Sequence, residues 1–164
     1  MILTKKEILQ EIKQKRLQIT PLNSKNIGPA SIDLTLSNEF RVFPPAKEIT
    51  LTEKTDAESI TFLQKQKSII LQPADFILAI TKEKITLPQD LCGLLSGRSR
   101  FARMGLLIDV TAFFIHPGVS NRQVFEIKNI SRNTITLTEG LKIAQLILVR
   151  AEGKAKYSGK FKKQ

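Results

Sequence analysis

Residues that support metal, disulfide and base-stacking chemistry are scarce in this chain. Among its 164 residues there is one cysteine, one histidine, one tyrosine and no tryptophan. The single residues are Cys92, His116 and Tyr157. One cysteine excludes a disulfide within the chain, and one cysteine with one histidine cannot assemble a Cys/His zinc site that activates water. Any hydrolytic chemistry is therefore expected to proceed without zinc.

Long apolar runs are also missing. No stretch approaches the roughly 20 apolar residues that a membrane span requires. The opening MILTKKEILQEIKQ carries two glutamates and no cleavable apolar core, so it does not resemble a signal peptide. We expect a cytoplasmic protein with no membrane partner. A hydrophobic content of 41% suits one domain over residues 1–164 with a sizeable core.

Positive charge, by contrast, is abundant, and the formal net charge is +11. Nucleic acid is the generic partner of such a chain. However, the basic residues are spread over both termini and several turns, and a base-stacking platform would have to rest on phenylalanine. A metabolite that carries a polyphosphate explains localised positive charge equally well, and we favour it over nucleic acid.

A helix is predicted at the N-terminus, over residues 1–16. Thr4 and Glu7 have the spacing of a capping box, and Ile8, Leu9 and Ile12 form a narrow apolar stripe.

From residue 31 onward the apolar period changes to two, which is typical of strands. Strands are predicted at residues 31–36, 40–43, 59–63, 68–71, 76–81, 92–95, 107–111, 124–128, 134–137 and 142–149. Turn residues rich in proline, glycine and aspartate separate them. Many short strands in one chain predict a mainly β fold, either a sandwich or a distorted barrel.

The run GRSRFAR at residues 97–103 contains the first candidate site. A glycine lets successive backbone N–H groups face an anion, and Arg98, Arg100 and the Ser99 hydroxyl supply donors that suit phosphate oxygens. A short helix from Ser99 would place Arg103 one turn beyond it on the same face. The alternative is an ordinary solvated basic turn.

Glu126 is the second candidate, although its periodicity argues against it. In residues 123–128 the natural core face is Phe125 and Ile127, which leaves Glu126 and Lys128 pointing outward. If another subunit covered that outer face, it would desolvate the carboxylate and raise its pKa toward a value useful for proton transfer.

Two further features are ambiguous. The C-terminal tail, residues 154–164, is either a disordered basic tail or a segment that closes over a bound polyanion. His116 stands before a Pro-Gly turn, where a histidine is more often structural than catalytic.

Taken in order, these segments resemble the dCTP deaminase family of the trimeric dUTPase superfamily. GPASIDL at 28–34 resembles the family's QPASVDLRL, LQPADFILA at 71–79 resembles PGEFVLA, SGRSRFARMGL at 96–106 resembles GRSSLARLGL, TA at 111–112 with IHPG at 115–118 resembles TA..IDPG, FEIKN at 125–129 resembles LELTN, and YSGKFKKQ at 157–164 resembles YSGKYQ.Q. The resemblance runs through most of the chain.

The resemblance implies a homotrimer of distorted β-barrels with nucleotide sites between subunits. It also implies hydrolytic deamination of dCTP to dUTP and ammonia, with dTTP as an inhibitor in many members. On this basis Glu126 corresponds to the catalytic glutamate, Ser99 and the carbonyl of Ala112 hold the attacking water, and Arg103 supports the glutamate.

The nucleotide-binding positions follow from the same resemblance, and they are Arg98, Ser99, Arg100, Val110, Thr111, His116, Tyr157, Lys160 and Gln164. A magnesium ion is expected on the triphosphate without ligands from protein side chains.

Four positions depart from the family pattern. Arg100 replaces a serine, Phe114 stands where some members have a basic residue, Asn121 replaces a common glycine, and His116 replaces an aspartate. Asparagine tolerates left-handed backbone angles. An imidazole does not reproduce the carboxylate base of the dUTPases, so His116 argues against efficient hydrolysis of dUTP to dUMP.

Two alternatives therefore accompany the prediction of a zinc-independent dCTP deaminase. One is a dUTP diphosphatase or a bifunctional enzyme that continues to dUMP. The other is a regulatory homologue that binds dCTP, dTTP or nucleic acid without catalysis.

Overall fold

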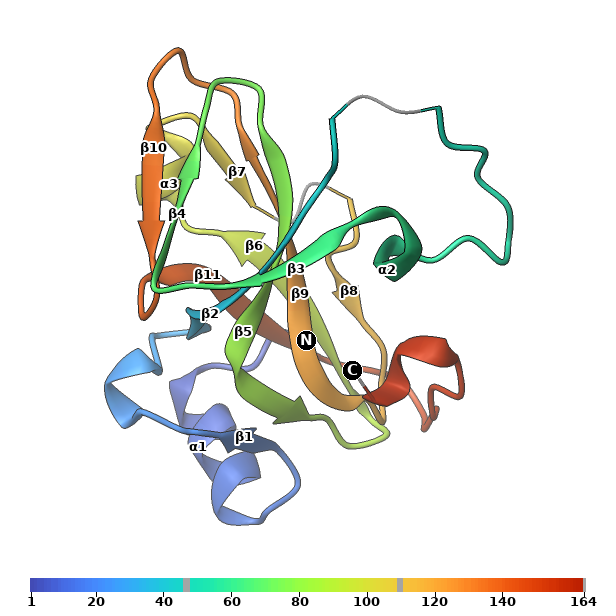
Figure 1. Ribbon diagram of the computed structural model, residues 1–164. Coiled ribbons are helices and arrows are strands. Elements are labelled where there is room, and N and C mark those ends of the chain that lie inside the picture. The colour runs from blue at the N-terminus through green and yellow to red at the C-terminus, as the bar shows by residue number, and fades with distance from the viewer. Residues whose placement is uncertain (46–47, 109–110, 164) are drawn as a thin grey trace.

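The computed structural model describes residues 1–45, 48–108 and 111–163 (Figure 1). Val110 and Gln164, two of the predicted nucleotide-binding positions, lie outside the described residues. The helical segments of the described part are α1 (Lys5–Lys13), η1 (Ser24–Asn26), α2 (Ala57–Ile60), α3 (Ser99–Ala102) and η2 (Lys160–Lys163). The strands are β1 (Gln18–Thr20), β2 (Ile32–Val42), β3 (Phe62–Lys65), β4 (Ser68–Leu71), β5 (Phe76–Thr86), β6 (Leu91–Gly97), β7 (Leu106–Ile108), β8 (Phe114–Ile115), β9 (Ser120–Asn129), β10 (Ile135–Thr138) and β11 (Lys142–Arg150).

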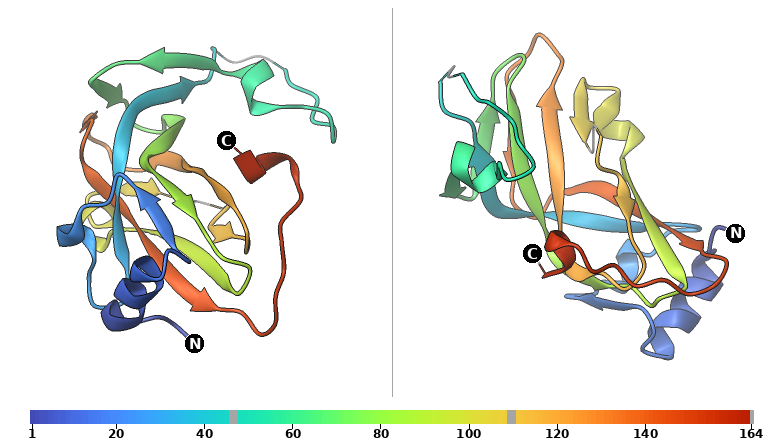
Figure 2. Two further views of the ribbon diagram at one scale, coloured as in Figure 1. Left: turned by 90° about the horizontal axis from the view of Figure 1, so that it is seen from below. Right: turned by 90° about the vertical axis from the view of Figure 1, so that its right-hand side faces the viewer.

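The prediction of a mainly β fold is confirmed. One nine-stranded sheet runs in the order β7-β9-β5-β2-β11-β6-β8, with β1 added on β5 and β3 added on β2. The named pairs are antiparallel, and β4 and β10 form a separate two-stranded sheet. The large sheet curls around the core as a half-barrel (Figures 1 and 2).

Alternation of apolar and polar residues explains why these segments become strands with one buried face. In β2 the side chains of Ile32, Leu34 and Leu36 are buried. In β9 the predicted core pair, Phe125 and Ile127, is fully buried. Successive side chains of a strand point to opposite faces, so the core face of β9 fixes the outward direction of its neighbours.

The N-terminal helix is shorter than predicted, and its inner face differs. Leu9 is 43% exposed, whereas Glu11 is only 6% exposed. Glu11 can be buried because Arg150 and Arg16 each place a guanidinium nitrogen within 2.8 Å of its carboxylate. Thr4 is the N-cap, as the capping box predicts, but its hydroxyl donates to the Glu7 carboxylate and makes no hydrogen bond to the helix backbone.

The prediction of a strand at residues 59–63 is wrong in its first part. Residues 57–60 form the short helix α2, because the Asp56 side chain caps it by accepting a hydrogen bond from the Glu58 N–H. The strand β3 starts only at Phe62 and lies at the edge of the large sheet. Strands β1 and β8 are too short to show a period, and the sequence did not predict them.

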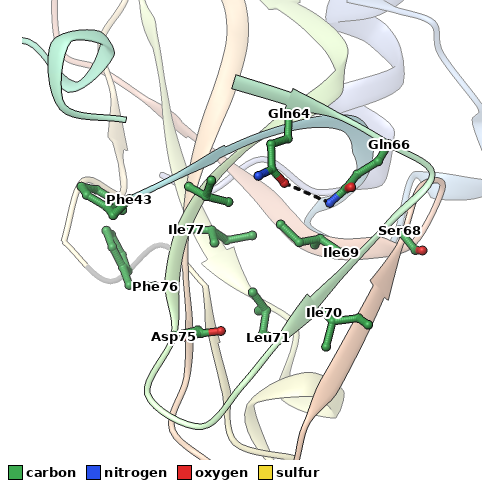
Figure 3. A pocket seen from close by; sticks show the side chains of 11 residues that line it. Phe43, Gln64, Gln66, Ser68, Ile69, Ile70, Leu71, Asp75, Phe76 and Ile77 are labelled. Atoms are coloured by element: carbon green, nitrogen blue, oxygen red, sulfur yellow. Dashed lines mark hydrogen bonds between the residues drawn. The ribbon is translucent and has the colours of Figure 1, made fainter. Parts of the chain in front are cut away.

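A hollow of about 470 Å³ lies between β3, β4 and β5 (Figure 3). The rings of Phe43 and Phe76 lie at one end of it, with centroids 5.4 Å apart. At the other end the Gln66 amide donates to the Gln64 side chain. None of the predicted site residues lines this hollow.

The helices in the described part of the chain all lack the length and apolar character that a membrane span requires.

Candidate active site

The Glu126 carboxylate is held in a defined position on the outer face of β9. The Thr111 N–H donates to Oε2 of Glu126 at 2.8 Å. The Thr111 hydroxyl lies 2.8 Å from Oε2 and 3.0 Å from Oε1. Because Thr111 precedes β8 and Glu126 lies in β9, these contacts attach the loop before β8 to strand β9.

Glu126 lines a cavity of about 800 Å³. Apolar side chains of β5, β6 and β9 form part of its wall, including Leu78, Leu95 and Val124. Ala112, whose carbonyl is the predicted water ligand, lines the same cavity. The cavity therefore places the Glu126 carboxylate beside apolar side chains, and this combination suits a flat heterocycle whose ring must meet a proton carrier.

The apolar period of β9 thus predicts the direction of Glu126 correctly, but the simplest interpretation, an ordinary solvated side chain, is wrong. Glu126 does point away from the core, yet it is half-buried and faces a cavity. An outward-facing carboxylate on a strand is an ordinary solvated group unless something concave lies above it. The sequence could not show that concavity because it is built by the loops before β8 and around α2.

The Arg-rich turn forms the predicted short helix, α3, directly after β6. Arg98 is its N-cap and is half-buried: its Nη1 donates to the Lys142 carbonyl at 2.9 Å, and its Nε lies 3.5 Å from Oδ1 of Asp33. Ser99, Arg100 and Arg103 are exposed. An exposed set of two guanidinium groups and a hydroxyl around a helix start can bind an anion.

The two halves of the predicted site lie apart in one chain. Arg98, Ser99, Arg100 and Arg103 do not line the Glu126 cavity. Figures 1 and 2 place α3 and α2 on opposite sides of the molecule, and α2 is the element whose start borders the cavity. The chain by itself does not bring the phosphate donors to the carboxylate.

The tail, in contrast, lies at the cavity. Tyr157, Lys160 and Phe161 line it, as does His116. The Lys160 ammonium is paired with the Asp56 carboxylate at the start of α2. That hydrogen bond holds the pKa of Asp56 below its ordinary value. The predicted phosphate ligand Lys160 therefore has a carboxylate partner within its own chain.

Several residues at the cavity were not singled out from the sequence as site residues. Asp56 caps α2 and pairs with Lys160, and Gln123 is a buried amide that donates to the Asn121 side chain. Asn121 lies in β9 and is absent from the residues with positive φ. Tolerance of left-handed angles is therefore not why an asparagine stands there. The only sequence signal for the pair was two amides on the buried face of a strand.

The family assignment rests on sequence comparison. The family described as dCTP deaminase-like matches residues 2–151. The chain belongs to the dCTP deaminase-like family. Among its relatives, a Mycolicibacterium vanbaalenii protein named "dCTP deaminase, dUMP-forming" is 37% identical over 160 residues, which is 96% of this chain and 84% of that protein. A Mycolicibacterium smegmatis protein of the same name is 38% identical over 153 residues, covering 92% of this chain and 81% of that protein.

The fold is similar to that of solved structures. A 2'-deoxycytidine 5'-triphosphate deaminase from Agrobacterium tumefaciens matches with a TM-score of 0.71 at 18% identity, over 92% of this chain. This chain covers 48% of that protein's chain, about half of it. The EIAV dUTPase matches with a TM-score of 0.56 at 23% identity, covering 87% of this chain and 93% of that one. The family recognised from the motifs is confirmed, and so is the expectation that the chain is an enzyme of the dCTP deaminase-like family.

Proposed function

We propose that this chain catalyses the hydrolytic deamination of dCTP. The observation that carries the proposal is the Glu126 carboxylate, fixed by the Thr111 N–H and hydroxyl at a cavity whose walls are partly apolar. The relatives' names supply the substrate class. A pyrimidine ring fits the apolar walls, and its C4 must lie near Glu126 for the reaction.

In the proposed mechanism Glu126 is the proton shuttle. It takes a proton from water as the oxygen adds to C4 of cytosine, delivers a proton to N3, and helps the amine leave as ammonia. The Thr111 donors keep both carboxylate oxygens oriented throughout. The Ala112 carbonyl is the proposed acceptor for the attacking water. One oxygen enters and one nitrogen leaves, so no redox partner is required.

The triphosphate end of the proposed site requires a second copy of the chain. Arg98, Ser99 and Arg103 lie on α3, away from the Glu126 cavity of the same chain. A symmetric ring would bring α3 of one copy to the cavity of the next. We therefore propose a homotrimer in which Arg98 and Ser99 hold phosphate, Arg103 supports Glu126 across the interface, and the tail supplies Lys160.

Metal requirements are part of the same proposal. Among the described residues, no group of three His, Cys, Asp or Glu side chains is placed to hold a metal ion. The magnesium ion is therefore proposed to sit on the phosphates alone, where it would neutralise charge. The deamination itself is proposed to run on Glu126, without zinc.

The test is an assay of dCTP turnover by the purified protein. Ammonia release and loss of the cytosine chromophore are expected with magnesium present, and their persistence after zinc chelation would support the zinc-independent route. Glu126→Gln should lower kcat by about 10²- to 10⁴-fold, the usual contribution of a general acid–base. Glu152→Gln, a change at an exposed carboxylate that does not line the cavity, is the matched control. Equal turnover by Glu126→Gln and the parent chain would overturn the mechanism.

A second candidate concerns the final product. The curated relatives described above are named dUMP-forming, which does not support the expectation, drawn from His116, that the reaction stops at dUTP. If the chain shares their outcome, dUTP is hydrolysed further to dUMP and pyrophosphate. Chromatography of nucleotides during a single turnover decides this: dUMP with pyrophosphate supports the dUMP-forming activity, and stoichiometric dUTP excludes it.

A further inference from the structure

The C-terminal tail is attached to its own chain along most of its length. After β11 it returns toward β9 in a wide arc (Figure 2). The Ala155 N–H donates to the Gln89 carbonyl at 2.8 Å, and the Tyr157 N–H donates to the Pro117 carbonyl at 2.9 Å. Next to Pro117, a Cβ on Gly118 would lie 3.2 Å from the Lys156 side chain. The tail therefore passes in close contact with the turn at residues 116–118.

His116 provides an aromatic contact for this tail. Its ring is stacked on the ring of Tyr157, with centroids 5.0 Å apart and an interplanar angle of 5°. Phe114 contacts the imidazole edge-on at 4.8 Å. A Cβ on Gly159 would lie 2.3 Å from the Tyr157 hydroxyl, so the chain can turn back over the ring only because residue 159 is glycine.

Asn121 provides a second, polar contact further along the tail. Its side-chain amide donates to the Phe161 carbonyl at 2.5 Å, and its Oδ1 accepts from the Gln123 amide. Asn121 is 4% exposed. Both polar groups of a buried side chain are thus used, one to anchor the tail and one to be oriented by its neighbour on β9.

We propose that His116 and Asn121 are positioning residues that hold the tail closed over the Glu126 cavity through contacts within the chain, which need no nucleotide. Aspartate and glycine, the residues of the family pattern at these positions, can neither stack on an aromatic ring nor donate an amide hydrogen bond. In this chain the closed tail uses both side chains. It places Tyr157 and Lys160 at the cavity in advance, which reduces the ordering that substrate binding must accomplish.

The chain carries its own reporter for this contact. Tyr157 is the only tyrosine and there is no tryptophan, so tyrosine fluorescence reports on the tail alone. The experiment measures acrylamide quenching and anisotropy of Tyr157 in the full-length, nucleotide-free protein. His116→Asp removes the stack, whereas His116→Phe is the matched control that retains an aromatic ring on an exposed position.

In the parent chain we expect a shielded tyrosine of high anisotropy. His116→Asp should increase the fraction of open tail by about two- to tenfold, the range that corresponds to one aromatic pair, and His116→Phe should stay near the parent. Asn121→Gly should also increase quenching, with thermal unfolding recorded to show that it folds. The proposal is overturned if the parent tyrosine is as accessible as in the guanidinium-unfolded chain, or if His116→Asp matches the parent.

The expected effect on kinetics rests on the proposed function, whereas the fluorescence experiment tests the closed tail independently of it. With dCTP as substrate, His116→Asp should raise KM by a larger factor than it lowers kcat, because the tail must then be ordered on binding. A shielded Tyr157 in a protein that does not deaminate dCTP would refute the proposed function and leave the closed tail standing. Deamination of dCTP by a protein with a freely accessible Tyr157 would support the proposed function and refute the closed tail.

Discussion

The Thr111 hydroxyl and N–H both donate to the carboxylate of Glu126, each at 2.8 Å from Oε2. Thr111→Val retains the N–H and the shape of the side chain but removes the hydroxyl. We expect kcat for dCTP deamination to fall about tenfold, the rate equivalent of one hydrogen bond to a charged group. Thr111→Ser, which keeps the hydroxyl, should remain near the parent. Unchanged steady-state kinetics in Thr111→Val would show that the N–H alone orients Glu126.

The buried carboxylate of Glu11 predicts an acid-sensitive attachment of α1. Burial raises the pKa of Glu11, but hydrogen bonds from Arg150 and Arg16 outweigh it and hold the pKa below its ordinary value. A lowered pKa in the folded state stabilises the protein above the ordinary carboxyl pKa of about 4.3, and this contribution is lost as the pH falls through the folded value. Glu11→Gln should therefore cost about 1–3 kcal/mol at neutral pH.

Denaturant unfolding at neutral pH and near pH 3 checks this prediction. The difference between Glu11→Gln and the parent should shrink at the lower pH, because the stability contributed by the lowered pKa of Glu11 is lost as the pH falls toward the folded value. Glu152→Gln, at an exposed position, is the control and should have little effect at either pH. A pH-independent difference would assign the effect to packing.

Asn129 at the end of β9 is predicted to be important for stability. It is fully buried, and its amide lies 2.8 Å from the Asn133 carbonyl and 3.1 Å from the carbonyls of Leu71 and Gln72. Asn129→Ala leaves these acceptors without their donor and should lower the free energy of unfolding by about 2–3 kcal/mol. Asn133→Ala, which keeps the backbone acceptor on an exposed residue, should cost far less in the same denaturation experiment.

Gly105 lies in the turn that follows α3. Comparing it with Gly140 separates the cost of backbone strain from the cost of a steric clash. Gly105 has a φ of +82°, and a Cβ on it would lie 2.6 Å from the Ser131 Cβ. Gly140 has a φ of +88° but no atom within 4 Å of such a Cβ. Gly140→Ala should cost about 1 kcal/mol through backbone strain alone. Gly105→Ala should cost clearly more in thermal unfolding, and equal losses would show that Ser131 moves aside freely.

The sequence predicted best where a regular period coincided with burial. The core face of β9, the strand β4 and the short helix at Ser99 all follow from local pattern and turn chemistry. The burial of Glu11 could not be predicted, because its partner Arg150 lies 139 residues away in the chain. The helix α2 was missed since its cap, Asp56, stabilises only one turn within a segment that reads as a strand.

In the candidate site, too, the sequence predicted the local features but not the contacts between distant segments. Residue types and family order identified Glu126 and the Arg-rich turn, but not that they lie on different faces of one chain. Nor did the sequence show that His116, a predicted nucleotide-binding position, and Asn121, a departure from the family pattern, both contact the tail. Such contacts depend on how distant loops meet, which no local period encodes.

The distance between α3 and the Glu126 cavity has a genetic consequence in the proposed trimer. A chain with Glu126→Gln still offers an intact α3, and a chain with Arg103→Ala still offers an intact carboxylate. Two inactive alleles expressed together would then complement each other, with about one quarter of the sites intact in an equal random mixture of subunits. Each kind of chain would supply the group that the other lacks.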